Sequence, residues 1–129
     1  MTCALLDSDV LIDVLRGTGP AREWIDENRE QPFLVPGVVA MELVVGSRDK
    51  HGLQRALKLL RHFEVAWPSS HETRRAYDLL IEHSLSTAIG IPDCMIAAMA
   101  IERSLHLHSF NLKHFRQIEG LEVSAPYAR

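Results

Sequence analysis

Short apolar runs alternate along the chain with segments in which apolar residues recur every three or four positions. The runs are CALLD (3–7), PFLVP (32–36), FEVAW (63–67), LHLHSF (105–110) and LEVS (121–124). Runs of this length, set between helical segments, are typical of strands in a parallel sheet. The pattern predicts an α/β fold in which a parallel sheet of about five strands is covered by helices on both faces.

The intervening segments carry the helical spacing. A first helix is predicted directly after the first run, ending near Arg16 and Gly17, and a second over residues 20–30, where Pro20 suits the first turn. Further helices are predicted over residues 37–46, 51–62, 70–85 and 92–104. The last of these is apolar nearly all round, so we expect it to be buried.

Composition favours a single globular domain over residues 1–129. Hydrophobic residues make up 47% of the chain and charged residues 24%, an ordinary globular mixture, and the length leaves little room for a second domain. Two cysteines, Cys3 and Cys94, lie in apolar surroundings without metal-like spacing, which favours buried free thiols. The chain shows no leader-like start and no apolar run near the ~18 residues of a membrane span, so we expect a soluble, cytoplasmic protein without a membrane partner.

Three acidic residues stand beside or within apolar segments. Asp7 lies at the carboxyl end of the first predicted strand, the edge where ligands bind in open α/β sheets. Glu42 interrupts an apolar helix, where a glutamate is costly unless it is paired or bound to a cation. Asp93 opens the helix 92–104. Each has an ordinary alternative: Asp7 as a helix N-cap, Glu42 as a solvent-facing residue, and Asp93 as a charge that favours the first helical turn.

Taken together, the three acids indicate more than capping. They can reach one point above the sheet if the first two strands and the helix 92–104 are neighbours. Carboxylates gathered there repel one another and raise each other's pKa values unless a divalent cation lies between them. Mg²⁺ and Mn²⁺ prefer such oxygen ligands and also bind phosphates. The acids therefore predict a divalent-cation site at this edge.

Four segments in this order resemble the successive motifs of the PIN-domain ribonucleases, and most of all the VapC toxins of toxin–antitoxin pairs. They read LLDSDVLIDVLRG (5–17), VVAMELVVG (38–46), IPDCMIAAMA (91–100) and LHSFNLKHF (107–115). The resemblance implies a PIN-like three-layer α/β/α fold over the whole chain. It also implies that Asp7, Glu42 and Asp93 are the catalytic, metal-binding acids and that Ser8 is the small hydroxyl residue of the first motif. Asp9 stands where the family usually has asparagine.

The same resemblance implies a metal-dependent endoribonuclease that uses Mg²⁺ or Mn²⁺ and cuts structured RNA such as tRNA or rRNA. It implies two partners, a small cognate antitoxin and a second copy of the chain, and we expect the homodimer to form through Leu53, Leu57, Leu60 and the apolar stripe of helix 70–85. The formal net charge of −3 argues against RNA binding by bulk charge. A confined basic rim is expected instead, with the candidates Arg16, Arg48, Lys50, Lys113 and Arg116.

The last motif departs from the family pattern. The family often has a fourth acid there, whereas this segment holds Asn111 and His114. Asn111 either takes the fourth position, where its amide oxygen can orient a water or touch a cation, or only shapes the loop. Asp9 is expected either beside the metal ligands or at the helix cap. Asp13, near the end of the same helix, is expected to be solvated or ion-paired rather than a ligand.

Two other functions remain open from the sequence alone. LLDSDV also resembles the DxD motif of haloacid-dehalogenase phosphatases, in which Asp7 would attack phosphorus and Asp9 would act as acid and base. Glu42 has no role in that interpretation, and 129 residues is short for that fold. Alternatively, the chain keeps the PIN fold as a catalytically weak binding module, an interpretation that Asn111 supports.

Overall fold

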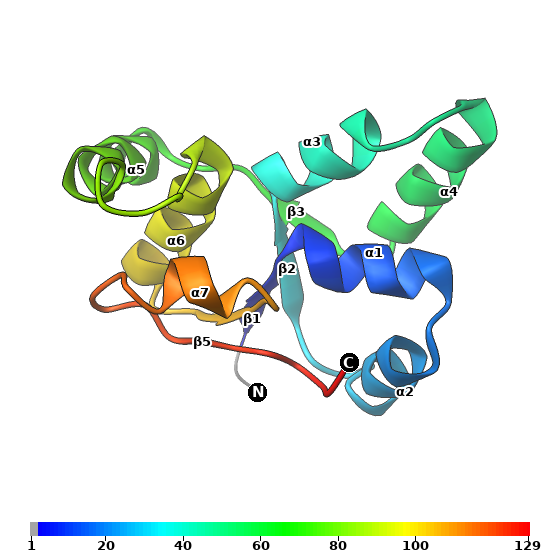
Figure 1. Cartoon of the computed structure of the whole chain (residues 1–129). Helices are drawn as coiled ribbons and strands as arrows, with labels where there is room; N and C mark the ends of the chain where they lie inside the picture. Colours follow the sequence, from blue (N-terminus) through cyan, green and yellow to red (C-terminus); the bar gives the residue numbers. More distant parts are fainter. Residues whose placement is uncertain (1–2) are drawn as a thin grey trace.

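The computed structural model describes residues 3–129 and contains one five-stranded sheet. The strands are β1 (Ala4–Leu6), β2 (Phe33–Pro36), β3 (Glu64–Ala66), β4 (His106–His108) and β5 (Val123–Ser124). Their order across the sheet is β3-β2-β1-β4-β5, and every neighbouring pair is parallel. All five predicted strands are confirmed, and so is the α/β class with a parallel sheet. β1 lies at the centre, between β2 and β4 (Figure 1).

Seven helices connect the strands within the described residues. They are α1 (Ser8–Arg16), α2 (Gly19–Glu27), α3 (Gly37–Val45), α4 (Lys50–Leu60), α5 (Ser70–His83), α6 (Ile91–Arg103) and α7 (Leu112–Phe115). Six of them were predicted, with boundaries that shift by a few residues. α1 ends where expected, because Gly17 adopts the left-handed conformation with φ of 71° and its backbone N–H satisfies the last turn. α7 was not predicted, since a helix of four residues is too short for a periodic pattern.

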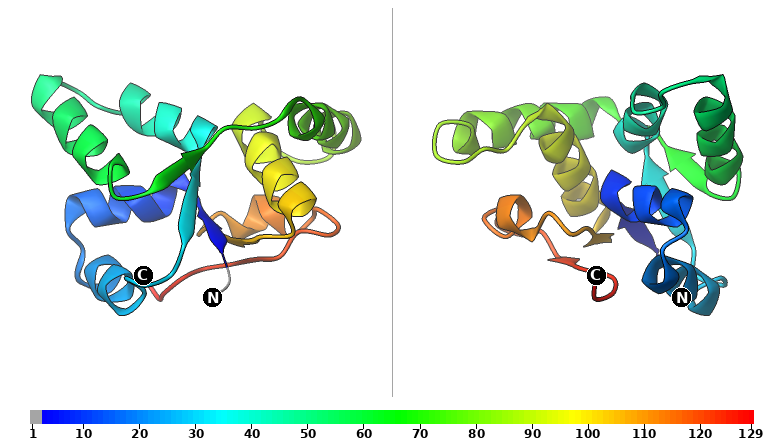
Figure 2. Two further views of the ribbon diagram at one scale, coloured as in Figure 1. Left: turned by 180° about the vertical axis from the view of Figure 1, so that it is seen from behind. Right: turned by 45° about the vertical axis from the view of Figure 1, so that its right-hand side comes forward.

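The helices pack in sequential pairs around the sheet, α1 with α2, α3 with α4, and α5 with α6 (Figures 1 and 2). On one face, Trp24 of α2 lies 5.1 Å from the rings of both Phe33 and His108. Leu107 points to the opposite face and is fully buried, because successive side chains of a strand alternate between faces. Helices on both faces give the three-layer α/β/α arrangement that the sequence predicted.

The core is formed by the central strand and by α6. Leu5 and Leu6 of β1 are fully buried, and Ile96 and Met99 of α6 are each only 1% exposed. Burying each such side chain contributes about 1.5–3 kcal/mol. Phe115 of α7 is also fully buried and belongs to the same core. The prediction that helix 92–104 is buried is therefore confirmed.

Two strands pass directly into helices, and this brings their carboxyl ends to one edge of the sheet. β1 ends at Leu6 and α1 begins at Ser8, so that Asp7 is the only residue between them. β2 runs into α3 without a loop, at Gly37, where a side chain would collide with the Trp67 ring at 2.2 Å. Because all strands are parallel, these junctions and the segment after β4 share one edge.

Both cysteines are free thiols, as expected, although Cys3 is only half-buried while Cys94 is buried. Among residues 3–129, no helix combines the length and the apolar character that crossing a membrane requires.

Candidate active site

Asp7 is a buried carboxylate at the centre of the carboxyl edge, with only 5% of its surface exposed. Its Oδ1 accepts the backbone N–H of Ser8 at 2.7 Å, so Asp7 is the N-cap of α1. Its Oδ2 accepts the hydroxyl of Ser109 at 2.7 Å. Burial, together with the charges of Asp9 and Glu42, raises the pKa of Asp7 to about 7. The side chain therefore serves as a helix cap and also lies where the cation site was predicted.

Asp9 lies in the first turn of α1 and reaches across to the segment that follows β4. Its Oδ2 accepts the backbone N–H of Phe110 at 2.9 Å and lies 3.4 Å from the hydroxyl of Ser109. Its Oδ1 is buried without a hydrogen-bond partner in the described part of the chain. Burial raises its pKa. Of the two expectations for Asp9, the helix cap is wrong, because Asp7 occupies that position.

Glu42 is exposed on α3, as the alternative of a solvent-facing residue predicted. Its carboxylate borders a groove between α1, α3 and α4. Partial burial, followed by the charges of Asp93 and Asp9, raises the pKa of Glu42. The charge of Glu42 in turn contributes to the raised pKa of Asp7. The side chain is therefore open to solvent but lies within electrostatic reach of the other acids.

Asp93 lies in the first turn of α6 and is half-buried. Its Oδ2 is 3.2 Å from Nδ1 of His114, and the side-chain amide of Asn111 lies 3.0 Å from the same ring nitrogen. Asn111 and His114 therefore face Asp93, in the position where the family often has a fourth acid.

Four carboxylates, Asp7, Asp9, Glu42 and Asp93, thus form one electrostatic cluster at the carboxyl edge. Within residues 3–129, no three of the acidic, histidine or cysteine side chains lie close enough to hold one ion together. The unpartnered Oδ1 of Asp9 and the raised pKa values both fit an added hard cation, which oxygen ligands prefer. That Asp7, Glu42 and Asp93 share one cation stays a prediction.

The groove next to Glu42 has a volume of about 530 Å³ and both apolar and basic walls. Arg16 and Arg48, two of the predicted RNA-contacting residues, line it. Lys50, Lys113 and Arg116 are exposed elsewhere. Arg55 also lines the groove and was missed from the sequence; it donates a hydrogen bond to the carbonyl of Leu15 at 2.6 Å.

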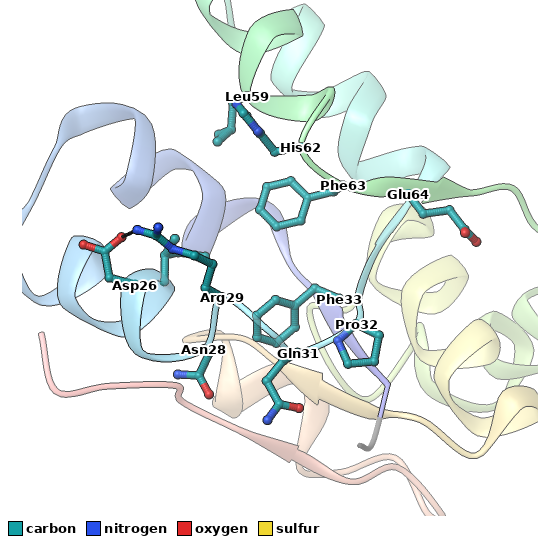
Figure 3. Close-up of a pocket in the computed structure, with 11 residues that line it drawn as sticks. Asp26, Asn28, Arg29, Gln31, Pro32, Phe33, Leu59, His62, Phe63 and Glu64 are labelled. Carbon is teal, nitrogen blue, oxygen red and sulfur yellow. Dashed lines mark hydrogen bonds and ion pairs between the residues drawn. The ribbon is translucent and has the colours of Figure 1, made fainter.

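A second cavity, of about 590 Å³, opens at the opposite, amino-terminal edge of the sheet (Figure 3). Phe33 and Phe63 point into it, and Arg29 on its rim forms an exposed ion pair with Asp26 at 3.0 Å. The four clustered carboxylates lie at the other edge. The candidate site therefore lies at the carboxyl edge, and this cavity is separate from it.

Two further groups of contacts were not predicted from the sequence. Ser109 holds Asp7 from 102 residues away. Asp13 is buried and receives two hydrogen bonds from the Arg129 guanidinium and one from the Tyr127 hydroxyl, which confirms the expectation that it is ion-paired. The motif SFN was the only sequence signal for Ser109, and nothing in the sequence signals the partner of Asp13.

Comparison with known proteins identifies the family to which the chain is similar. The profile of the PIN domain matches residues 4–121. Ribonuclease VapC10 of Mycobacterium tuberculosis is 34% identical over 119 residues, which make up 92% of this chain and 90% of that protein. A toxin–antitoxin complex from Klebsiella pneumoniae is similar with a TM-score of 0.78 and 28% identity, covering 98% of this chain and 99% of that one. VapBC2 from Rickettsia felis, solved with a promoter DNA fragment, has a TM-score of 0.82 at 21% identity over 96% of this chain and 98% of that one, and supports the fold alone.

The parallel sheet with acids gathered at its carboxyl edge, together with the matching profile, defines the class: the chain belongs to the PIN domain family. Within that family it is VapC-like, because its relatives and structural neighbours are VapC proteins and toxin–antitoxin complexes. The haloacid-dehalogenase interpretation is therefore wrong. That interpretation left Glu42 without a role, whereas here its charge acts on Asp7.

Proposed function

We propose that this chain is a metal-dependent endoribonuclease and the toxin of a VapBC-type toxin–antitoxin pair, acting on structured RNA such as tRNA or rRNA in the cytoplasm. The observation that carries the proposal is the gathering of Asp7, Asp9, Glu42 and Asp93 at the carboxyl edge of the sheet, where burial and the charges of neighbouring acids raise the pKa values of Asp7 and Glu42, and burial raises that of Asp9. The relatives named ribonuclease VapC support the reaction.

Each acid has a proposed role. Asp7, Glu42 and Asp93 would hold Mg²⁺ or Mn²⁺, while Ser8 and Asp9 would support them from outside. When bound, the metal neutralises charge on the scissile phosphate and lowers the pKa of a bound water. The hydroxyl of Ser109 fixes one oxygen of Asp7 and so determines how the carboxylate is presented.

The basic residues beside the cluster support RNA as the substrate. Arg16 and Arg48 line the groove that Glu42 borders, so phosphates of a bound strand would meet positive charge within reach of the acids. A chain of net charge −3 needs this local arrangement. A single-stranded loop of a structured RNA is the shape that can present one phosphodiester to such a site.

We propose that the antitoxin binds in the same groove, the one that Glu42 borders. It has an apolar floor that includes Ile12, Leu15 and Leu43, with the arginines on its rim. The neighbour from Klebsiella pneumoniae is a toxin–antitoxin complex, and this similarity supports a protein partner for the present chain. An antitoxin segment seated there would lie beside Glu42 and would block access to the acids.

A homodimer is proposed through the outer face of α5. Tyr77 and Ile81 of α5 and Leu85, two residues beyond its end, recur every fourth position and are exposed by 58%, 64% and 101%. The expected contribution of Leu60 is wrong, because this side chain turns inward and joins the core. The same holds for Ala76 and Leu79 of the predicted stripe over residues 70–85, which are buried as well. Leu57 stays 40% exposed on α4. An exposed apolar row of this kind marks an interaction surface.

We expect Ile81→Glu combined with Leu85→Glu to convert a dimer into a folded monomer. Buried charges at a symmetric interface are repeated on both copies, so the penalty is doubled. Light scattering at micromolar concentration measures the mass, and circular dichroism checks the fold. Glu82→Gln, on the same helix, serves as a control that leaves the mass unchanged. A parent protein that is already monomeric at these concentrations would refute the dimer.

RNA cleavage by purified protein tests the proposed function directly. We expect tRNA or rRNA fragments to be cut with Mg²⁺ or Mn²⁺ and to stay intact with a chelator. Asp7→Asn, Glu42→Gln and Asp93→Asn should each abolish cutting. Glu102→Gln, which changes a carboxylate that pairs with His71 and Arg75, is the matched control and should cut normally.

Equal cutting by the parent and the three site variants would contradict the assignment of these acids. A parent that binds RNA and metal but never cuts would favour the catalytically weak binding module instead.

A further inference from the structure

Hydrogen bonds after β4 join the two acids that lie farthest apart in the sequence. Ser109 donates its hydroxyl to Asp7 Oδ2 at 2.7 Å and accepts the backbone N–H of Asn111 at 3.0 Å. The Asn111 side-chain amide lies 3.0 Å from Nδ1 of His114, and that nitrogen lies 3.2 Å from Asp93 Oδ2. The segment 109–114 therefore connects a carboxylate at the end of β1 to one at the start of α6.

The chemistry of these atoms determines which way the hydrogens point. A carboxylate only accepts hydrogen bonds, so Nδ1 of His114 must carry a proton to bond Asp93. The Asn111 atom nearest to this nitrogen is the amide Nδ2, at 3.0 Å, and an NH₂ group there would oppose the N–H. We therefore assign the amide with its oxygen towards the ring, because the two ends of an amide have nearly the same shape. One Nδ1–H is shared between the oxygens of Asp93 and Asn111. In the neutral ring, the other nitrogen, Nε2, then carries no proton.

The position of His114 is held by its neighbours in the chain. Phe115 is fully buried, whereas Lys113 and Arg116 are exposed. α7 is only four residues long, so the burial of the Phe115 ring determines how this short helix is rotated about its axis. With Phe115 directed into the core, the preceding residue faces the start of α6. The imidazole is therefore aimed at Asp93 by the packing of α7.

We propose that His114 is a positioning residue for Asp93, and that Asn111 sets the ring tautomer that this requires. The Nδ1–H holds Oδ2, which leaves the other oxygen of Asp93 free to face the cleft. In this chain the last motif orients the existing acids instead of adding a fourth one. The inference rests on the proposed function, since holding Asp93 affects catalysis only if Asp93 is a ligand.

Three substitutions at one position separate positioning from simple packing. His114→Asn keeps an N–H donor close to where Nδ1 lies, His114→Gln moves the donor outward, and His114→Leu removes it. We expect Mn²⁺ affinity, measured by calorimetry, to fall about 10–100-fold in the leucine variant. The asparagine variant should keep most of the affinity, with glutamine between them. For RNA cleavage, kcat should fall in the same order while KM for RNA is unchanged.

His71→Leu is the matched control. His71 makes an equivalent contact, from Nε2 to Glu102 at 3.1 Å, but on the exposed surface away from the acids. It should leave Mn²⁺ affinity and kcat as they are in the parent. Thermal melting of all four variants measures folding separately. A leucine variant that binds Mn²⁺ and cuts RNA like the parent would overturn the proposal, and so would equal losses in the asparagine and leucine variants.

The tautomer is tested without any activity measurement. In protein labelled with ¹⁵N-histidine, the Nδ1 resonance of His114 should be that of a protonated nitrogen at pH 8 in the metal-free state. Asn111→Leu should shift this signal towards the Nε2–H form. An unprotonated Nδ1 in the parent would overturn the proposal. If the parent fails to cut RNA, the proposed function fails, whereas this spectrum still decides how His114 and Asp93 are bonded.

Discussion

Two carboxylates with the same small exposed surface, the N-cap Asp7 of α1 and Asp13 in the second half of this helix, have pKa values shifted in opposite directions. Asp7 and Asp13 each expose 5% of their surface. The guanidinium of Arg129 bonds both oxygens of Asp13, at 3.0 and 3.1 Å, and the hydroxyl of Tyr127 adds a bond at 2.9 Å. These hydrogen bonds, from Arg129 first, hold the pKa of Asp13 below its usual range. Asp7, by contrast, has a pKa of about 7 because it is buried near other acids.

The difference teaches that burial alone does not decide the state of a carboxylate. Both groups accept hydrogen bonds, but within residues 3–129 only Asp13 has a cationic partner among the ion pairs. A carboxylate with a structural role is neutralised by the chain itself. Asp7 has no such partner, and a raised pKa in a buried acid is a feature by which candidate functional sites are recognised.

The sharpest way to test this comparison is to remove charge at each end of the helix. Arg129→Ala leaves Asp13 buried and unpaired, so we expect a loss of about 1–3 kcal/mol in the free energy of unfolding. Asp7→Asn removes a buried charge that lacks a cationic partner, so metal-free stability should stay level or rise. Urea denaturation with a chelator present measures both values.

Arg29→Ala is the control for Arg129→Ala. Its ion pair with Asp26 is exposed on both sides, and such surface pairs contribute only about 0–1 kcal/mol. If Asp7→Asn lowers the free energy of unfolding as much as Arg129→Ala does, the charge of Asp7 is stabilised in the folded state as well as that of Asp13, and the comparison fails.

The two ends of α1 should also respond oppositely to pH. The folded pKa of Asp7 lies above the unfolded value, so the folded state binds the extra proton between about pH 4 and pH 7. Metal-free stability should therefore fall as the pH rises through this range, and Asp7→Asn should flatten the slope. Asp13 has a lowered folded pKa, so its contribution is present above pH 4 and is lost only as the medium becomes more acidic.

Melting curves in a chelator from pH 3 to pH 8 check these slopes. Asp13→Asn should change the curve at its acidic end and leave the slope between pH 5 and pH 7 as it is in the parent. A parent curve that rises steadily from pH 4 to pH 7 would contradict the raised pKa of Asp7.

The smallest expected effect concerns Asn111. Asn111→Asp keeps an oxygen that can accept the Nδ1–H of His114 and adds a full negative charge near the cluster. We expect a severalfold gain in Mn²⁺ affinity, with a stronger dependence on pH because clustered acids are harder to ionise together. Calorimetric titration at two pH values measures both. Unchanged affinity at both pH values would place residue 111 outside the metal site, as a residue that acts on the loop alone.

Local patterns were enough to predict most of the secondary structure. The apolar runs predicted every strand, and helical spacing predicted six helices, because these signals depend on neighbours in the sequence. The position of Asp7 at the end of the first apolar run also predicted that it lies at the carboxyl edge of the sheet. The helix α7 was missed because four residues show no period, and Leu60 was misplaced because spacing shows an apolar face but not what covers it.

The contacts that define the site are of another kind. Ser109 bonds Asp7 across 102 residues, and Arg129 bonds Asp13 across 116. Such pairs depend on how strands and helices are arranged in space, which periodicity does not encode. The family resemblance placed the acids near each other, but it left open whether Asp9 capped the helix and what Asn111 contacted.

The position of β1 also has a consequence for the order of events during synthesis. The strand is among the first segments made, yet one of its two neighbours, β4, and the Ser109 hydroxyl come about a hundred residues later. At ribosomal speeds this interval is roughly 5–20 s. A nascent chain therefore carries Asp7 for many seconds before the residue that orients it exists. The carboxyl edge of the sheet is therefore complete only after the chain has been made through β4 and the segment that follows it.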